Sequence, residues 1–350
     1  MLAAFNTIIP SIRSIQSRPG VAVPNHRYSN LAPLPYDTVS FGASEKNIEN
    51  KKYGVNFATA KQVNVIAKDS EKYLKKQLSD IFSDIVRDPD DPTTFDRPIE
   101  AVSFRTKSAE SIKEKSASRK FFNVQEIKSH MTDLVGARLI FADASKQNID
   151  KAVLRLADAE ANNKLKILEI ENYRPDPILD EDGKVEKSYD YASPKALTKL
   201  KNECDKHGSI IPKRDEDLPT GYMALHFLVQ LPNGLTGEIQ MLGTDVAELK
   251  EIEDLCYKTK AGKSVDKKYA PVAKMLQPLA DKSDTILQNE YMRYTRDAYI
   301  VQRDKEPQIG KHKLQTKFLE IPDYLPKELD FNVIDNKMRE CDALSKKDNK

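Results

Sequence analysis

The stretch TGYMALHFLVQLPNGLTGEIQ, residues 220–240, predicts a β-hairpin. Apolar residues alternate with others along residues 227–231, Pro232-Asn233-Gly234 supplies the residues of a turn, and residues 235–240 return as the partner strand. The flanking sequence decides whether this hairpin carries a site.

Three residues of this stretch suggest chemistry. Gly221 lets the backbone approach a ligand closely, and the ring of the adjacent Tyr222 could stack on a base. Glu238, on the return strand, could serve a divalent metal or accept a proton. The alternative is an ordinary half-exposed hairpin with one glutamate.

Composition indicates a protein with a core of ordinary size. The chain has 350 residues, 39% of them hydrophobic and 31% charged. It contains no run of about 18 apolar residues, so we expect no membrane span and no membrane partner. The 56 basic and 54 acidic residues leave a net charge of +2, so any site for an anion must be local.

The cysteines and histidines restrict the metal chemistry. Cys204, Cys256 and Cys341 are odd in number and form no CxxC motif, so we expect a reducing compartment, a cytoplasmic location and no structural zinc. With only five histidines, metal binding is expected to rest on carboxylates.

Apolar periodicity and turn residues divide the chain into regions. We predict a disordered leader at 1–55, loosely similar in composition to a transit peptide, an N-terminal helix at 56–95, a central domain at 96–262, a C-terminal helix at 263–300 and a weakly ordered tail at 301–350. Within the central domain we predict strands at 101–104, 136–141 and 165–170, helices at 108–116, 146–161, 194–204 and 245–260, and a long insertion or acceptor loop at 173–218. The predicted class is α+β, with a mixed sheet flanked by helices and helical extensions at both ends.

Basic residues surround the start of the predicted helix at 108–116. If Ser108 caps this helix, Arg105 and Lys107 stand at its N-terminus, and Ser111 and Lys115 lie four apart on one face. Such a group of cations beside a helix N-terminus suits a nucleoside triphosphate. The alternative is a solvated basic helix start.

Asp133 precedes the predicted buried strand at 136–141, and Arg138 lies inside it. Asp133 and Glu238, each near the sheet, could share one Mg²⁺ through oxygen ligands, although Asp133 could also be a loop cap. A charge inside a strand is paired or points into a cleft, so Arg138 is a further candidate. In the helix at 245–260, Glu253, Asp254 and Lys258 are expected on a solvated face.

These blocks together resemble the nucleotidyltransferase domain of the RelA/SpoT family, the alarmone synthetases. The resemblance covers about residues 98–260 and includes five blocks in family order. They are Arg105, Lys107, Ser111 and Lys115; Asp133 and Arg138; Gly221, Tyr222 and His226; Glu238 and Gln240; and Tyr257 and Lys258.

The resemblance implies transfer of pyrophosphate from ATP to the 3′-hydroxyl of GDP or GTP. It implies that Arg105, Lys107, Ser111, Lys115 and Arg138 hold ATP, and that Asp133 and Glu238 are catalytic and bind Mg²⁺. Tyr222, His226, Gln240, Lys213 and Arg214 are assigned to the acceptor on the same basis. Phosphoryl transfer depends on positioning and charge neutralisation, which agrees with these residue types.

Two departures from the family pattern leave the acceptor open. Leu242 stands where many members have an arginine, and Leu218 where many have a basic residue. Each lost charge-assisted hydrogen bond would cost about 1.5–3 kcal/mol, which should weaken binding of a 5′-phosphorylated guanosine. The resemblance to toxic small members of the family, which pyrophosphorylate the 3′ end of tRNA, leaves that end as the alternative acceptor. A catalytically degenerate nucleotide-binding or effector domain is a second alternative.

The resemblance also bears on other functions and partners. No histidine precedes an aspartate, so we expect the hydrolase half of the bifunctional members to be absent. Small members of the family often form tetramers, which leaves a homo-oligomer open.

Overall fold

The computed structural model describes residues 54–174, 178–179, 185–187, 190–206, 213–217, 220–263, 265–281, 283–305 and 321–347. For residues 178–179, 185–187 and 213–217 it describes the backbone alone. Apart from residues 54 and 55, the predicted leader lies outside the described residues.

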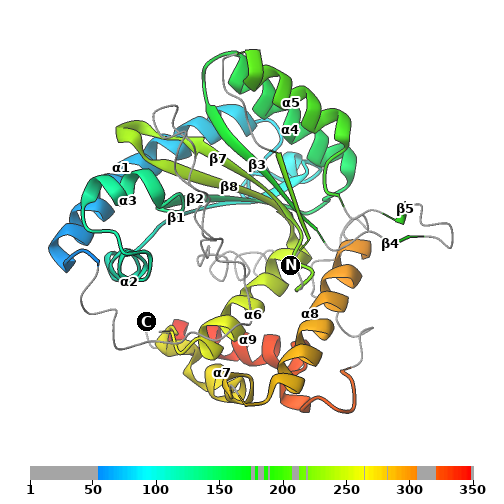
Figure 1. Ribbon diagram of the computed structural model, residues 1–350. Helices are drawn as coiled ribbons and strands as arrows, with labels where there is room; N and C mark the ends of the chain where they lie inside the picture. The colour runs from blue at the N-terminus through cyan, green and yellow to red at the C-terminus, as the bar shows by residue number, and fades with distance from the viewer. Residues whose placement is uncertain are drawn as a thin grey trace.

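A mixed sheet with helices on both faces forms the centre of the fold, which confirms the predicted α+β class (Figure 1). The six strands are, in spatial order, β1 (Ile99–Thr106), β2 (Val135–Phe141), β8 (Thr236–Gly243), β7 (Ala224–Gln230), β3 (Lys166–Arg174) and β6 (Lys213–Asp217). The pairs β2–β8 and β3–β6 are parallel, and the other neighbours are antiparallel. A separate ribbon pairs β4 (Ile178–Leu179) with β5 (Val185–Lys187).

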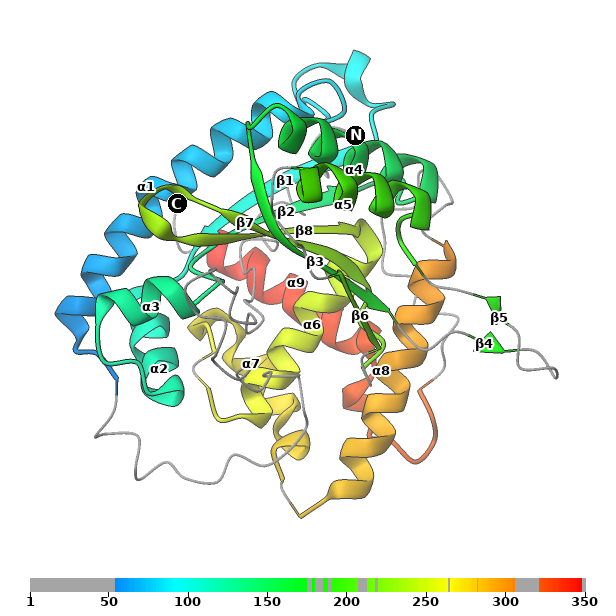
Figure 2. The same ribbon diagram turned by 45° about the horizontal axis from the view of Figure 1, so that its top comes forward.

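The helices form two groups (Figures 1 and 2). The first comprises α1 (Phe57–Phe82), α4 (Lys146–Ala161) and α5 (Pro194–Lys206) on one face of the sheet, with α2 (Ala109–Arg119) and α3 (Val124–His130) beside α1. The second comprises α6 (Thr244–Lys260), α7 (Ala270–Met275), α8 (Thr285–Lys305) and α9 (Phe331–Lys347) on the opposite face. Among all the described residues, no helix is both long and apolar enough to cross a membrane.

The two faces of the sheet differ in chemistry. Alternate residues of β2 and β8, such as Leu139, Phe141, Ile239 and Met241, are fully buried on the side of α1 and α4. Each such side chain contributes about 1.5–3 kcal/mol through burial. The other face, toward α6, carries polar residues, and it is therefore the face on which a site can form.

The predicted hairpin is present, and its Pro232-Asn233-Gly234 turn has left-handed φ angles at Asn233 and Gly234. The stretch predicted as an insertion, 173–218, differs from the expectation. The helix predicted at 194–204 is confirmed as α5, which packs against α4, but β3 extends to Arg174 and β6 joins the edge of the main sheet. Parallel pairing with β3 explains why this polar segment is ordered as a strand.

The C-terminal region also differs from the prediction. The single helix expected near residues 267–294 is divided into α7, a 3₁₀ turn at Gln277–Ala280 and α8, because Pro278 cannot continue a helix. The tail contains α9, which buries Phe331, Ile334 and Cys341. The three cysteines, Cys204, Cys256 and Cys341, are free and buried.

Candidate functional site

A row of polar side chains crosses the sheet on the face toward α6. The backbone register places Ser103, Arg138, Gln240, His226 and Glu171 side by side, from β1 to β3. Residues in register across a sheet point to the same face. The last four of these side chains are at most 3% exposed, so the row is an interior polar layer.

Arg138 connects this row to α6. Its Nη1 donates to Glu251 Oε1 over 2.9 Å, and its Nε donates to Gln240 Oε1 over 3.1 Å. Gln240 Nε2 in turn donates to Glu238 Oε2 over 2.9 Å. The charge predicted inside the strand is therefore paired, and it positions Glu238 through Gln240. Its assignment to ATP stays a prediction.

A second row brings a cation and a carboxylate level with each other. Arg105 of β1 is in register with Gly136 of β2, and Gly136 with Glu238 of β8. Two strand spacings of about 4.8 Å put the backbones of Arg105 and Glu238 roughly 10 Å apart. The residue between them has no side chain, so the two charged groups face the same region of the sheet.

The predicted basic group is built around Asp133. Ser108 caps α2 by accepting from the backbone N–H of Ser111 over 3.2 Å, as the sequence indicated. Lys107 Nζ and Lys115 Nζ both donate to Asp133 Oδ2, over 3.0 and 2.7 Å. Lys107 is only 4% exposed, which excludes a solvated basic helix start at that position.

Burial changes the acidity of Lys107. Desolvation lowers the pKa of its ammonium group to about 8, although the nearby Asp133 carboxylate opposes this shift. Lys107 is therefore a cation whose charge depends on pH close to the physiological range.

Asp133 and Glu238 belong to separate clusters in the structure. The Asp133 carboxylate is neutralised by two lysines, whereas Glu238 contacts His226 and Gln240. Both offer the oxygen ligands that Mg²⁺ prefers. A magnesium shared by the two stays a prediction.

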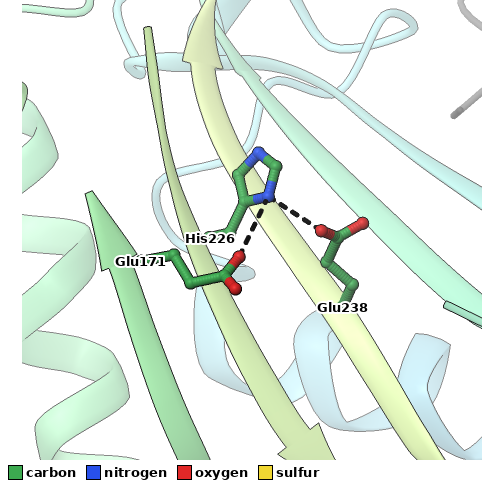
Figure 3. Close-up of side chains that lie close together, drawn as sticks. All are labelled: Glu171, His226 and Glu238. Atoms are coloured by element: carbon green, nitrogen blue, oxygen red, sulfur yellow. Dashed lines mark ion pairs between the residues drawn. The ribbon is translucent and has the colours of Figure 1, made fainter. Parts of the chain in front are cut away.

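Three buried residues on neighbouring strands converge on one point (Figure 3). His226 Nδ1 lies 2.8 Å from Glu238 Oε1 and 3.7 Å from Glu171 Oε2. On the other side of the ring, His226 Nε2 lies 3.0 Å from the hydroxyl oxygen of Tyr222. Tyr173 donates its hydroxyl hydrogen to Glu171 Oε2 over 2.9 Å. Among the described residues, Glu171, His226 and Glu238 form the one group of histidine, cysteine and carboxylate side chains with metal-ligand spacing.

The ring of Tyr222 is fully buried. The rings of Tyr173 and Tyr299 have their centroids 6.0 and 5.8 Å away, and Lys250 Nζ lies 5.0 Å from the centre of the Tyr222 ring. A base could stack on Tyr222 only after these neighbours move, so its role as a base platform stays a prediction that requires an opening motion.

The glycine before this tyrosine packs against α8. Gly221 has a φ of +73°, and a Cβ at this position would lie 2.8 Å from the Cα of Arg296. Both the backbone conformation and the close approach require glycine. The loop that carries Tyr222 is therefore fitted to the backbone of α8.

The face of α6 that was expected in solvent is buried. Glu253 and Asp254 are each 3% exposed, and Lys250 Nζ lies 3.0 Å from a Glu253 oxygen and 2.7 Å from an Asp254 oxygen. Tyr299 of α8 donates its hydroxyl hydrogen to Glu253 over 2.5 Å. The prediction was wrong because α6 lies between the polar face of the sheet and α8, so its charged residues find partners on both sides.

The acceptor residues predicted upstream are only partly described. Lys213 and Arg214 lie in β6, beside Ile170 and Glu171 in register, but their side chains are outside the described residues, as is all of Leu218. Leu242 is fully buried and pairs with Ile140. The position where many family members have an arginine thus belongs to the hydrophobic core.

Sequence reasoning missed Glu171, Tyr173 and Tyr299. Glu171 follows the apolar residues of β3, and a glutamate continuing a strand pattern was a usable signal. Tyr299 gave no signal, because its place beside Tyr222 depends on how α8 folds back.

Comparison with known proteins gives distant structural matches only. No family model matches the chain, and no curated protein sequence matches it. A crystal structure of small alarmone synthetase 1 from Bacillus subtilis matches at 18% identity and a TM-score of 0.35, covering 70% of this chain and 96% of that one. The same Bacillus protein bound to its product pppGpp matches at 20% identity and a TM-score of 0.32, over 66% and 93% of the two chains. A GTP pyrophosphokinase family protein from Streptococcus pneumoniae matches at 17% identity and a TM-score of 0.33, over 70% and 94%. These are proteins of the family that the sequence motifs resemble, but with scores this low the side chains of this chain have to carry any functional conclusion.

Proposed function

We propose that the protein is a pyrophosphokinase that transfers the pyrophosphate group of ATP to the 3′-hydroxyl of GDP or GTP. The observation that supports this most directly is the second row of the sheet. It places the cation Arg105 and the carboxylate Glu238 on one face, with Gly136 between them. A polyphosphate needs cations that neutralise its charge, and an attacking hydroxyl needs a group that can take its proton.

The cations would hold the phosphates of ATP. Lys107 stands beside the N-terminus of α2, Lys115 lies within that helix, and Arg105 lies at the adjacent end of β1. The present counter-ion of the two lysines is Asp133, so bound phosphates would replace or share that carboxylate. Magnesium accompanying the phosphates would supply further charge neutralisation, with Asp133 and Glu238 as its predicted ligands.

Glu238 would accept the proton of the 3′-hydroxyl. As the hydroxyl oxygen bonds to the β-phosphorus, the bond from that phosphorus to the oxygen bridging the α-phosphate breaks, and AMP leaves. His226 and Gln240 hold the carboxylate in a fixed orientation through bonds of 2.8 and 2.9 Å. Fixed orientation is what makes a carboxylate an effective general base.

The acceptor base would stack on Tyr222. In the structure this ring is covered by Tyr299, so acceptor binding requires the loop at 220–223 to separate from α8.

The test is a transfer assay with γ-labelled ATP, magnesium, and GDP, GTP or deacylated tRNA as separate acceptors. We expect label on the guanosine nucleotides and its loss in Glu238→Gln. Glu169→Gln is the matched control, because Glu169 is equally buried on β3 but lies outside the proposed machinery. Label on none of the acceptors would refute the enzyme, and label on tRNA alone would refute a guanosine nucleotide as the acceptor.

A further inference from the structure

We propose that Glu171, His226 and Glu238 form a binding site for a first-row transition-metal dication, from the series Mn²⁺ to Zn²⁺. The site differs from the magnesium pair predicted from the sequence, since it includes His226 and Glu171 and leaves out Asp133. It shares Glu238 with the proposed reaction, but its test uses no nucleotide, so the two proposals can fail separately.

The distances already suit an ion. The three ligand atoms lie within 4.8 Å of one another, and Nδ1 of His226 is 2.8 and 3.7 Å from the two carboxylate oxygens. Around an ion with bonds of about 2.1 Å, neighbouring ligand atoms are roughly 3.0–3.4 Å apart. Small rotations of the glutamate side chains are enough to admit the metal.

The ligands are fixed by strands rather than by loops. They lie on the adjacent strands β3, β7 and β8, with Glu171 directly beside His226 and Glu238 on the diagonal. Ligands held on neighbouring strands are already ordered before the ion arrives, which reduces the entropic cost of binding.

Each ligand also has an outer partner. Tyr173 donates to Glu171, and Gln240 donates to Glu238. With a metal on Nδ1, the proton of His226 resides on Nε2, where the Tyr222 oxygen lies 3.0 Å away and can accept it. Such outer hydrogen bonds orient the ligands of protein metal sites and set the histidine tautomer.

Charge supports a cation here. Glu171 and Glu238 are each 3% exposed, and the imidazole between them is neutral when it binds a metal. Buried carboxylates are stable in the interior only when they are paired with opposite charge, and a bound dication would supply such charge to both glutamates. The nearby Arg138 and Lys250 direct their charges to carboxylates of α6.

The donor set selects the class of metal. Imidazole nitrogen suits zinc, copper, iron and nickel, whereas magnesium takes oxygen ligands and keeps several waters. A buried site with one nitrogen and two carboxylate ligands therefore disfavours magnesium.

The experiment titrates the full metal-stripped chain with Co²⁺, without nucleotide, and follows the visible absorption bands of the ion. We expect one Co²⁺ per chain, displaced by Zn²⁺ and retained in a large excess of Mg²⁺. Glu171→Gln and His226→Gln should weaken binding by at least about tenfold, whereas Glu169→Gln, a buried carboxylate on the same strand, should not.

A second measurement on the wild-type chain needs no variant. Proton NMR of the Co²⁺ form should show one strongly shifted exchangeable resonance from the His226 Nε2–H. Absence of that resonance, displacement by Mg²⁺, or equal weakening in Glu169→Gln and Glu171→Gln would overturn the site. Because no nucleotide is present, failure of the transfer assay would leave this result unaffected.

Discussion

Replacing Asp133 with asparagine removes the charge that neutralises two lysines. Asp133→Asn keeps the shape of the side chain but leaves Lys107, which is 4% exposed, without its carboxylate. Loss of an opposite charge at this distance lowers a lysine pKa by about two pH units, from about 8 in the wild type to roughly 6. At about pH 7 a lysine whose pKa is below 7 is already mostly neutral, so only the fall of the pKa from about 8 to about 7 changes the free energy of unfolding. A fall of about one pH unit corresponds to about 1.4 kcal/mol.

Lys115, whose side chain is 15% exposed, adds about 0.5–1 kcal/mol from its weaker ion pair. We therefore expect Asp133→Asn to lower the free energy of unfolding by about 2 kcal/mol at about pH 7. At about pH 9.5, Lys107 is neutral in the wild type and the variant alike, so only the Lys115 part of about 0.5–1 kcal/mol remains.

The assay is urea unfolding followed by circular dichroism at both pH values, since the chain has no tryptophan for fluorescence. Asp69→Asn is the control, because its ion pair with Lys72 is largely exposed, with side-chain exposures of 64% and 78%. A loss of the same size at both pH values, or a variant as stable as the wild type at the lower pH, would refute the role of Lys107.

Three further perturbations test the packing and the charges of the site. Gly221→Ala combines a left-handed φ with a clash against α8 and should lower the free energy of unfolding by about 2–4 kcal/mol. Gly234→Ala has the same φ of +73° but lies in open space, so it should cost about 1 kcal/mol. Thermal unfolding of both variants measures the difference, and equal losses would contradict the close approach of Gly221 to α8. Tyr299→Phe removes the hydrogen bond to a buried carboxylate of α6 and should cost about 1.5–3 kcal/mol, against little change in the more exposed Tyr73→Phe; denaturant midpoints that shift equally would count against it. The apparent KM for ATP should rise roughly tenfold between about pH 7 and 9.5 as Lys107 loses its proton, and Lys107→Arg should flatten this profile because a guanidinium stays charged; parallel profiles would show that Lys107 does not bind the phosphates.

Elements with strong periodicity were predictable from the sequence. The helix predicted at 146–161 coincides with α4, because Ile149, Val153 and Leu156 mark one buried face. The helix α3 was missed because only Ile127 is buried in its seven residues, and one residue makes no period. Its start is fixed instead by Asn123, whose side chain accepts from the backbone N–H of Glu126 over 2.9 Å.

The site was only partly accessible to sequence reasoning. Motif spacing grouped Lys107 with Lys115 and placed Asp133 in a separate block, whereas the structure brings all three into contact. The same reasoning expected metal chemistry from carboxylates alone, and so overlooked His226 beside Glu238 as a ligand pair. Their proximity depends on the pairing of β7 with β8, and the third member, on β3, depends on a further strand pairing that no local pattern encodes.

The strand order also determines when the site can form during folding. β8 is inserted between β2 and β7, although β2 ends at Phe141 and β8 begins at Thr236. Until that late segment has been synthesised, the inner edges of β2 and β7 have no partner, and such open edges invite association with other chains. Contacts between segments so distant in sequence form slowly, because a long loop must close first. A nascent chain that has not yet reached β8 would expose both edges and would contain none of the pairing that brings His226 to Glu238.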